Sequence, residues 1–134
     1  MFHEESSKFV NARSWRWLPG MKTMDGDRVK SVEKDGKCLL DRGYVSLDAN
    51  NNWCVVYPPL LHSDMPDVED AATVGGMLEV LHRATGMMVS FGIESNVWHV
   101  KFSLEDFDKN VYAASRADVL LAAFEAVDFG LREM

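Results

Sequence analysis

Cysteine is scarce in this chain of 134 residues, and its scarcity limits the chemistry open to the protein. The two cysteines, Cys38 and Cys54, each alternate with apolar residues in an expected strand. No second pair of Cys or His residues stands at zinc-ligand spacing, which argues against a structural metal site. A disulfide is geometrically possible if the two strands are neighbours. In a reducing compartment we expect buried free thiols instead.

Long apolar runs are also missing. The apolar stretch from Met87 to Ile93 is far shorter than the ~20 residues that span a bilayer, so we expect no membrane association. Residues 1–8 lack the basic start and apolar core of a secretory signal, and we interpret them as a flexible lead-in to a cytoplasmic protein. With 47% apolar and 26% charged residues, the chain has the composition of one soluble domain over residues 1–134.

Recognisable catalytic and cofactor motifs are absent from the sequence. It contains no Gly-x-Ser-x-Gly elbow, no phosphate-binding glycine loop and no paired-His helix motif, so we expect no cofactor. The loops 48–52 and 106–110 place oxygen ligands on alternate residues as a calcium loop does. The glycine required at the sixth position is replaced by Trp53 and Val111, and we therefore expect ordinary turns.

Positive charge is scarce in the second half of the chain. Residues 1–63 hold nine Lys/Arg against eight Asp/Glu, whereas residues 64–134 hold five against thirteen, a net charge of −8. The acidic half begins with four candidate partner-binding residues: Asp64, Asp67, Glu69 and Asp70. These acids could imitate a phosphate backbone toward a basic partner, or they could simply maintain solubility. Because the chain is acidic, we expect no direct binding to nucleic acid.

The region 9–61 is expected to be a β-meander, because turn-forming Gly, Asp and Asn residues recur at short intervals. Pro58-Pro59 ends the last expected strand, since proline supplies no ladder donor. The extended runs between the turns are 21–24, 27–33, 37–40, 44–47 and 53–57.

The region 62–134 is expected to form a helix, a β-hairpin and a second helix. The first helix begins near Asp70 and ends at Gly86, with one apolar stripe formed by Val74, Met77, Leu78 and Leu81. The pair Gly75-Gly76 costs this helix about 1 kcal/mol per glycine, and we attribute it to close packing of the helix on the sheet.

Alternating apolar residues over 87–93 and 98–102 predict the hairpin, followed by a polar turn at 105–110 and a third short strand at 111–114. The second helix begins at the capping residue Ser115 and ends at Gly130. Its buried stripe is predicted to be Leu120, Leu121, Phe124 and Val127. The fold expected from these elements is a single α+β domain in which an antiparallel sheet, meander plus hairpin, packs against two helices.

The segment Arg13-Ser14-Trp15-Arg16-Trp17 combines guanidinium groups with indoles. That mixture is typical of single-stranded nucleic-acid binding and of protein-binding hot spots, which makes Trp15 and Arg16 candidate partner-binding residues. The alternative favoured by the sequence is that Trp15 and Trp17 share one face of a first strand and anchor the core. No wider basic patch supports nucleic-acid binding.

The four histidines are scattered along the chain at positions 3, 62, 82 and 99. His82 and His99 could meet if the first helix packs against the hairpin, and with a nearby carboxylate they could act as an acid–base pair. Exposed surface positions are the simpler interpretation of both residues.

Three segments, 9–21, 65–78 and 115–126, resemble a group of small proteins of unknown function encoded by tailed phages and prophages. In that group an acidic Pro-Asp-x-x-Asp run also leads into an Ala-Thr-x-Gly helix, as at Pro66 to Gly75 here. The resemblance implies a phage origin, a bacterial cytoplasm as location and a shared fold. It implies no reaction and no catalytic residues.

Three hypotheses follow for the function. The first is a non-enzymatic accessory protein that binds a host or phage protein, in its sharpest form an acidic inhibitor of a host nucleic-acid-binding defence complex. The second is a small enzyme that uses His82 or His99 with a carboxylate. The third is a phage assembly component, for which the sign would be concentration-dependent oligomers.

Overall fold

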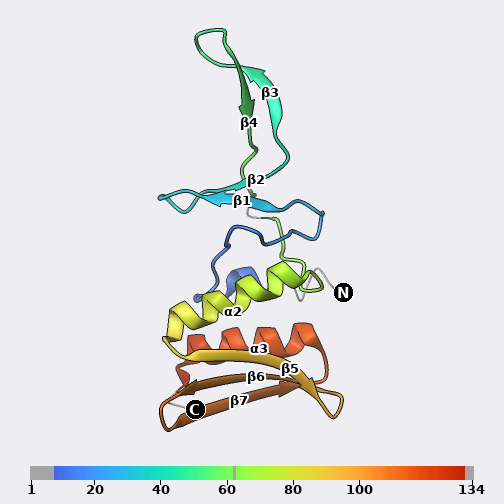
Figure 1. Ribbon diagram of the computed structural model, residues 1–134, viewed down its shortest axis with the longest axis vertical. Coiled ribbons are helices and arrows are strands. Elements are labelled where there is room, and N and C mark those ends of the chain that lie inside the picture. The colour runs from blue at the N-terminus through green and yellow to red at the C-terminus, as the bar shows by residue number, and fades with distance from the viewer. Residues whose placement is uncertain (1–7, 62, 132–134) are drawn as a thin grey trace.

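The computed structural model describes residues 8–61 and 63–131. The molecule is elongated and layered (Figure 1): a sheet lies at one end, two helices cover it, an extended segment crosses the helices, and two hairpins follow. The predicted class, a small mixed α+β domain of antiparallel strands and helices, is confirmed. The expected flexible lead-in at residues 1–8 lies outside the described residues except for Lys8, which lies in a short helical turn.

The sheet and the two helices that cover it form the part of the molecule that we call the base, residues 71–129. Its elements in chain order are α2 (Ala71–Thr85), β5 (Met88–Glu94), β6 (Val97–Leu104), β7 (Phe107–Ala113) and α3 (Arg116–Phe129). The strands are antiparallel in the order β5-β6-β7, and both helices lie on the same side of the sheet (Figure 1). Val100 and Phe102 of β6 point toward the helices and are fully buried.

Both helices of the base begin and end where the sequence predicts. The side chain of Asp70 accepts a hydrogen bond from the Thr73 amide at the start of α2, and Gly86 ends the helix in the left-handed conformation with φ of 71°. The hydroxyl of Ser115 accepts from the Asp118 amide at the start of α3, and Gly130 follows its last residue. These caps satisfy backbone groups that the helix itself cannot pair.

The third strand of the base is longer than predicted. The polar turn expected over 105–110 is confined to Glu105 and Asp106, and β7 already begins at Phe107. The polar residues Asp108 and Asn110 lie on the exposed face of this strand, so their polarity marks a half-solvated strand rather than a turn.

The first half of the chain forms two separate two-stranded antiparallel hairpins, so the described strands divide among three small sheets. The first hairpin joins β1 (Val29–Val32) to β2 (Cys38–Leu40), and the second joins β3 (Tyr44–Leu47) to β4 (Trp53–Val56). The run expected at 21–24 makes only isolated bridges, Lys22 with Arg28 and Thr23 with Pro66.

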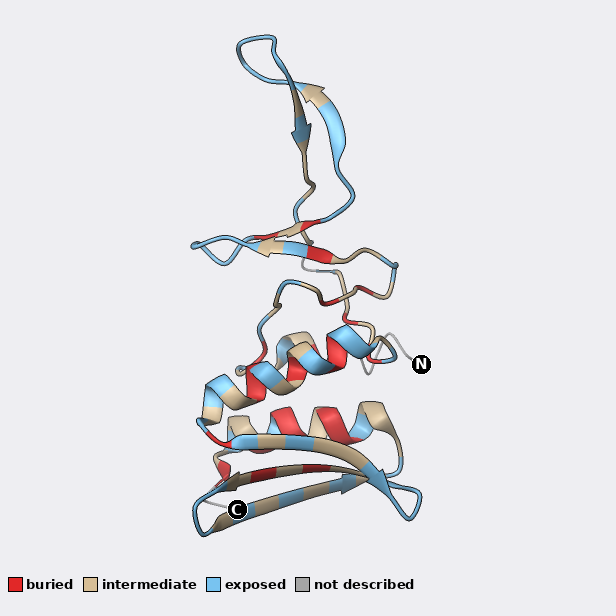
Figure 2. Ribbon diagram, viewed as in Figure 1, coloured by how far each residue is buried: buried red, intermediate tan, exposed pale blue. Residues whose placement is uncertain are grey.

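The core lies between the helices, the inner face of the sheet and the extended N-terminal segment (Figure 2). On α3, the ring of Phe124 packs edge-on against Phe9, with 6.0 Å between ring centroids. The close packing expected at the paired glycines is real at Gly76, where an added Cβ would lie 2.8 Å from Cε of Met21. The helix therefore approaches the N-terminal segment closely at this point, and not the sheet as the sequence predicts.

Candidate functional site

The predicted acidic run lies where the N-terminal segment meets α2, and its member with the most hydrogen bonds is Asp70. Arg28 donates to both carboxylate oxygens of Asp70, at 3.0 and 3.1 Å, while Thr73 donates from its amide and its hydroxyl. The hydrogen bond from Arg28 is the main reason that the pKa of Asp70 falls to about 2. Asp70 thus joins two parts of the chain and caps a helix.

The other three acids of the run also contact neighbouring residues. Asp64 accepts from the Leu61 amide at 2.7 Å. Asp67 accepts from the Glu69 amide at 3.0 Å and lies 3.9 Å from the ammonium of Lys22. Glu69 lies 3.6 Å from the guanidinium of Arg116 at the start of α3. All four carboxylates therefore have local structural partners, and their role in partner binding stays a prediction.

Several of the remaining acids of the second half lie away from this run, although Asp118 begins α3 close to Arg116, the partner of Glu69. Glu94 ends β5 and Glu105 follows β6, so they lie at opposite ends of the sheet. Glu79 pairs with Arg83 within α2 at 2.9 Å. Asp128 on α3 instead receives the backbone amides of residues 13 and 14, at 2.7 and 2.9 Å. The negative charge is therefore dispersed over the base.

Asp128 holds the N-terminal segment against α3. Burial alone would raise the pKa of its carboxyl, but hydrogen bonding from Ser14 and Arg13 outweighs burial and lowers the pKa below its ordinary value. The segment preceding Trp15 is thus tied to the C-terminal helix although the two lie far apart in the sequence.

The Trp-Arg segment belongs largely to the core. Trp15 is only 6% exposed, and its ring lies 5.4 Å from that of Phe124 and 5.3 Å from that of Trp17. The core interpretation of Trp15 is confirmed, but residues 15–18 have no strand conformation. Arg16 is exposed and donates from Nη1 to the carbonyls of Arg13 and Trp15, so its role toward a partner stays a prediction.

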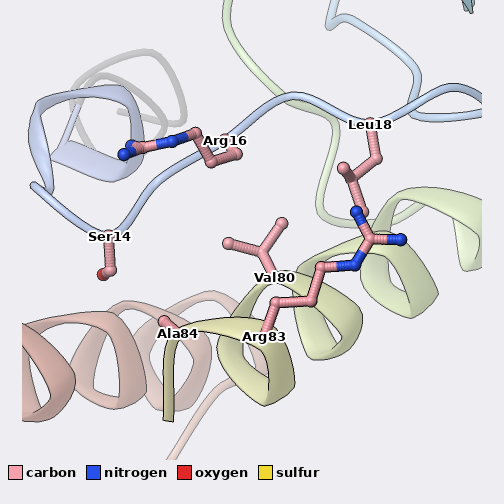
Figure 3. Close-up of a pocket in the computed structure, with 6 residues that line it drawn as sticks. All are labelled: Ser14, Arg16, Leu18, Val80, Arg83 and Ala84. Carbon is pink, nitrogen blue, oxygen red and sulfur yellow. The ribbon is translucent and has the colours of Figure 1, made fainter. Parts of the chain in front are cut away.

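A hollow of about 250 Å³ lies beside this segment, lined by Ser14, Arg16, Leu18, Val80, Arg83 and Ala84 (Figure 3). The side chain of Arg16 points away from α2, whereas that of Arg83 extends toward Leu18. Because the two guanidinium groups do not converge, the hollow lacks the clustered donors of an anion site.

The histidines that could have formed an acid–base pair are separated by the sheet. His82 lies on α2, with Nδ1 2.6 Å from the carbonyl oxygen of Met87. His99 lies on the opposite, helix-free face, stacked on Tyr112 with centroids 4.7 Å apart and with Nε2 2.8 Å from Oδ1 of Asn110. His3 and His62 lie outside the described residues. Within residues 8–61 and 63–131, no group of three His, Cys, Asp or Glu side chains could hold a metal ion.

Neither cysteine forms a disulfide. Cys38 is buried, and burial raises the pKa of its thiol, while Cys54 is half-buried in β4. The loop 48–52 is the ordinary turn that the sequence predicts, in which Asp48 accepts from the amides of Asn50 and Asn52 at 2.8 and 3.0 Å. No helix among the described residues is long and apolar enough to cross a membrane.

A group of exposed apolar side chains lies on the second hairpin, which we call the arm, residues 44–56. It projects from the end of the molecule farthest from the base (Figure 1). Val45 pairs with Val55, and Leu47 pairs with Trp53, so these four side chains share one side of the hairpin, the arm face. Their exposed fractions are 63% for Val45, 57% for Val55, 50% for Leu47 and 72% for Trp53.

The residues that follow the arm are hydrogen-bonded to the first hairpin. The Leu40 amide donates to the Pro58 carbonyl at 2.8 Å, and the Leu60 amide donates to the Cys38 carbonyl at 2.7 Å. At the base of the arm, a Cβ at Gly43 would lie 2.8 Å from side-chain atoms of both Tyr57 and Val55, so only glycine fits. These contacts hold the chain at the junction between the arm and the first hairpin.

Sequence reasoning identified the strands of the arm but missed its significance. The signal was present, because apolar residues alternate in both strands and place four of them on one side. Both strands also lack charged side chains. What the sequence could not show was whether another element covers that side.

A second apolar surface is a groove of about 520 Å³ between β7 and α3, which we call the edge groove. Its lining residues are Lys109, Asn110, Val111, Tyr112, Ala122, Glu125, Ala126 and Phe129.

Comparisons of the chain with protein-family models, with curated proteins and with solved structures found no match.

Proposed function

We propose that this protein is a non-enzymatic protein-binding module whose arm makes the principal contact with its partner. The observation that carries this proposal is the arm face, four large apolar side chains that are each at least half exposed on one side of a projecting hairpin. Contiguous exposed apolar patches on small soluble proteins mark interaction sites.

The chemistry of the arm face suits a protein partner. Tryptophan is enriched among the residues that dominate binding energy, and Trp53 is the most exposed large apolar residue of the described chain. A two-stranded hairpin is also marginally stable alone in water, so a partner that covers one side would stabilise it. The expected partner presents an apolar surface that excludes water from Trp53.

The resemblance to phage and prophage proteins supports a role as an accessory protein in the cytoplasm of a bacterial host. An accessory protein of this kind acts by occupying a surface of another protein. Within that role, the arm provides the contact and the base provides a stable support.

The acidic version of this proposal, inhibition of a host nucleic-acid-binding complex, has weaker support. Asp70 and Asp67 are engaged with Arg28 and Lys22, and the other acids of the base are dispersed. The enzymatic alternative is also weakened, because His82 and His99 lie on different sides of the sheet.

Affinity capture from a bacterial host lysate tests the proposal with matched variants. In the double substitution Val45→Thr/Val55→Thr, β-branched residues maintain strand propensity and shape while polar hydroxyls replace methyl groups in two of the four side chains of the arm face, beside Trp53. We expect the captured partner to be lost with this variant. It should be retained with Met88→Asp, which places a charge at a 69% exposed position of the base.

A third variant addresses the acidic version. Glu69→Lys reverses an exposed charge of the acidic run without removing the cap at Asp70. Retention of the partner by the double threonine variant would remove the arm from the function. Loss of the captured partner with Glu69→Lys, but not with the double threonine variant, would favour the acidic version.

A further inference from the structure

The edge groove lies beside a strand that can accept another strand. Among the described strands, whose order in this sheet is β5-β6-β7, β7 is an edge, and edge strands present backbone N–H and C=O groups on their outer side. An extended segment can add to such an edge through main-chain hydrogen bonds, while side-chain pockets next to it provide specificity. The edge groove provides such a pocket between β7 and α3.

The lining of the edge groove suits an uncharged, apolar segment. Ala122 on α3 is small and leaves room above the helix, and Phe129 at the end of the same helix is 66% exposed. The two charged residues of the lining, Lys109 and Glu125, have opposite signs. The groove is thus close to neutral, although the base as a whole is acidic.

We propose that the edge groove binds the arm of a second copy of this chain, with Trp53 as the anchoring side chain. This inference rests on the proposed function, since it names the partner of the arm. The arm has the properties that the groove requires: it is extended, it has no charged residue in either strand, and its apolar side chains alternate along one side.

The arrangement of the molecule makes the contact intermolecular. The arm and β7 lie at opposite ends of the elongated chain (Figure 1), so the arm cannot fill the groove of its own chain. The net charge of −7 also opposes the approach of two copies except where their surfaces are neutral. The arm and the edge groove are two such surfaces.

An arm-to-groove contact joins two different surfaces, so one copy of the pair retains a free groove and the other retains a free arm. Such head-to-tail contacts build closed rings or open chains. The wild-type protein should therefore form a concentration-dependent series of oligomers, and the series should not stop at a dimer unless a ring closes.

Light scattering coupled to size-exclusion chromatography, combined with sedimentation equilibrium, tests the contact through complementation. The arm variant is Val45→Thr/Val55→Thr, and the groove variant is Ala122→Trp, in which a large side chain fills the groove from a half-buried helix position. Each variant alone should be monomeric. An equimolar mixture should show a species of twofold mass, because one variant supplies an intact groove and the other an intact arm.

Three controls make each outcome decisive. Far-ultraviolet circular dichroism establishes that both variants are folded, and Phe129→Asp replaces the groove variant if Ala122→Trp is not. Met88→Asp should form oligomers as the wild type does. Self-association of the groove variant alone would overturn the proposal in favour of contact between two arms, and a mixture that stays monomeric would also overturn it.

The failure of this inference can be distinguished from failure of the proposed function. The wild-type protein could stay monomeric at all concentrations while the arm variant fails to capture the partner. That result would overturn self-association and leave the arm as a binding surface for another protein. If the arm variant captures the partner as well as the wild type does, the proposed function is overturned.

Discussion

The base and the arm are built from strands with the same alternation of apolar residues, yet only the base covers its apolar side. In β6, Val100 and Phe102 face two helices and are fully buried. In the arm, Val45 and Val55 face solvent and remain more than half exposed. The difference shows that alternation specifies an apolar side but not the element that covers it.

The comparison also separates the energetic roles of the two regions. Burying a large apolar side chain contributes about 1.5–3 kcal/mol, and the base gains this contribution many times over. The apolar side chains of the arm face do not gain this contribution. The residues that follow the arm are hydrogen-bonded to the first hairpin. Apolar surface that does not stabilise the isolated fold remains available for association with another protein.

The largest expected effect separates the base from the arm by stability. Phe124→Ala removes a fully buried ring that contacts Phe9 and Trp15, and it should lower the free energy of unfolding by about 3–5 kcal/mol. Trp53→Ala removes a largely exposed ring and should cost about 0.5 kcal/mol or less. Urea unfolding of the two variants measures both values. A Trp53→Ala cost similar to that of Phe124→Ala would mean that the arm face is covered in the isolated protein.

The next effect concerns the junction between the N-terminal segment and the base. Asp70→Ala removes the helix cap and should cost about 1 kcal/mol through the lost bond to Thr73, in addition to the contact with Arg28. Asp70→Asn keeps a capping oxygen but removes the charge, so it isolates the pairing with Arg28. Thermal unfolding at pH 7 should give the highest unfolding temperature for the wild type, a lower one for Asp70→Asn and the lowest for Asp70→Ala.

The pH dependence of this junction has a defined sign. The pKa of Asp70 is lowered from its ordinary value of 3.8 to about 2, so the stabilisation is fully present above pH 4 and lost as the pH falls toward 2. The difference in stability between wild type and Asp70→Asn should therefore shrink over that interval. A difference that persists unchanged at pH 2 would contradict the assignment to charge.

A smaller effect tests how closely α2 approaches the N-terminal segment. Gly75 has open space around its Cβ position, so Gly75→Ala should stabilise the protein by up to about 1 kcal/mol through helix propensity. At Gly76 the added methyl would lie 2.8 Å from Cε and 3.0 Å from Cγ of Met21. Gly76→Ala should therefore be about 1 kcal/mol less stable than Gly75→Ala. Equal unfolding midpoints for the two variants would show that Met21 moves aside without cost.

The smallest effect should be confined to the arm. The ammonium of Lys30 lies 4.5 Å from the centroid of the Tyr57 ring, where the arm joins the first hairpin. Lys30→Ala should cost about 0.5 kcal/mol, whereas Lys30→Arg preserves the cation over the ring. Amide exchange should rise in the alanine variant at Ser46 and Cys54 and stay unchanged in β6. A rise in both regions would mean that the arm and the base unfold together.

Much of the base could be predicted from the sequence because its signals are local. Asp70 and Ser115 begin helices by accepting from amides three residues later, and Gly86 ends a helix because it tolerates a positive φ. The length of β7 could not be predicted. Its outward residues Asp108 and Asn110 are also favoured in turns, and only pairing with β6 selects the strand.

Less of the candidate site could be predicted, because its properties depend on contacts between distant residues. The acidic run is prominent in the sequence, but its engagement with Lys22, Arg28 and Arg116 is not. Trp15 is similarly ambiguous in the sequence, since indoles serve both cores and interfaces. Its burial against Phe124 follows from the tie between Asp128 and the amides of the N-terminal segment.

The sequence by itself determined the class of fold, the helix ends, most of the strands and the apolar side of each strand. These features depend on backbone preferences and on alternation within a few residues. Only the tertiary structure decided which apolar sides are covered, because covering requires elements far apart in the chain to meet. The helices meet the sheet of the base and bury Val100 and Phe102, whereas the arm projects away from the helices and leaves Trp53 exposed.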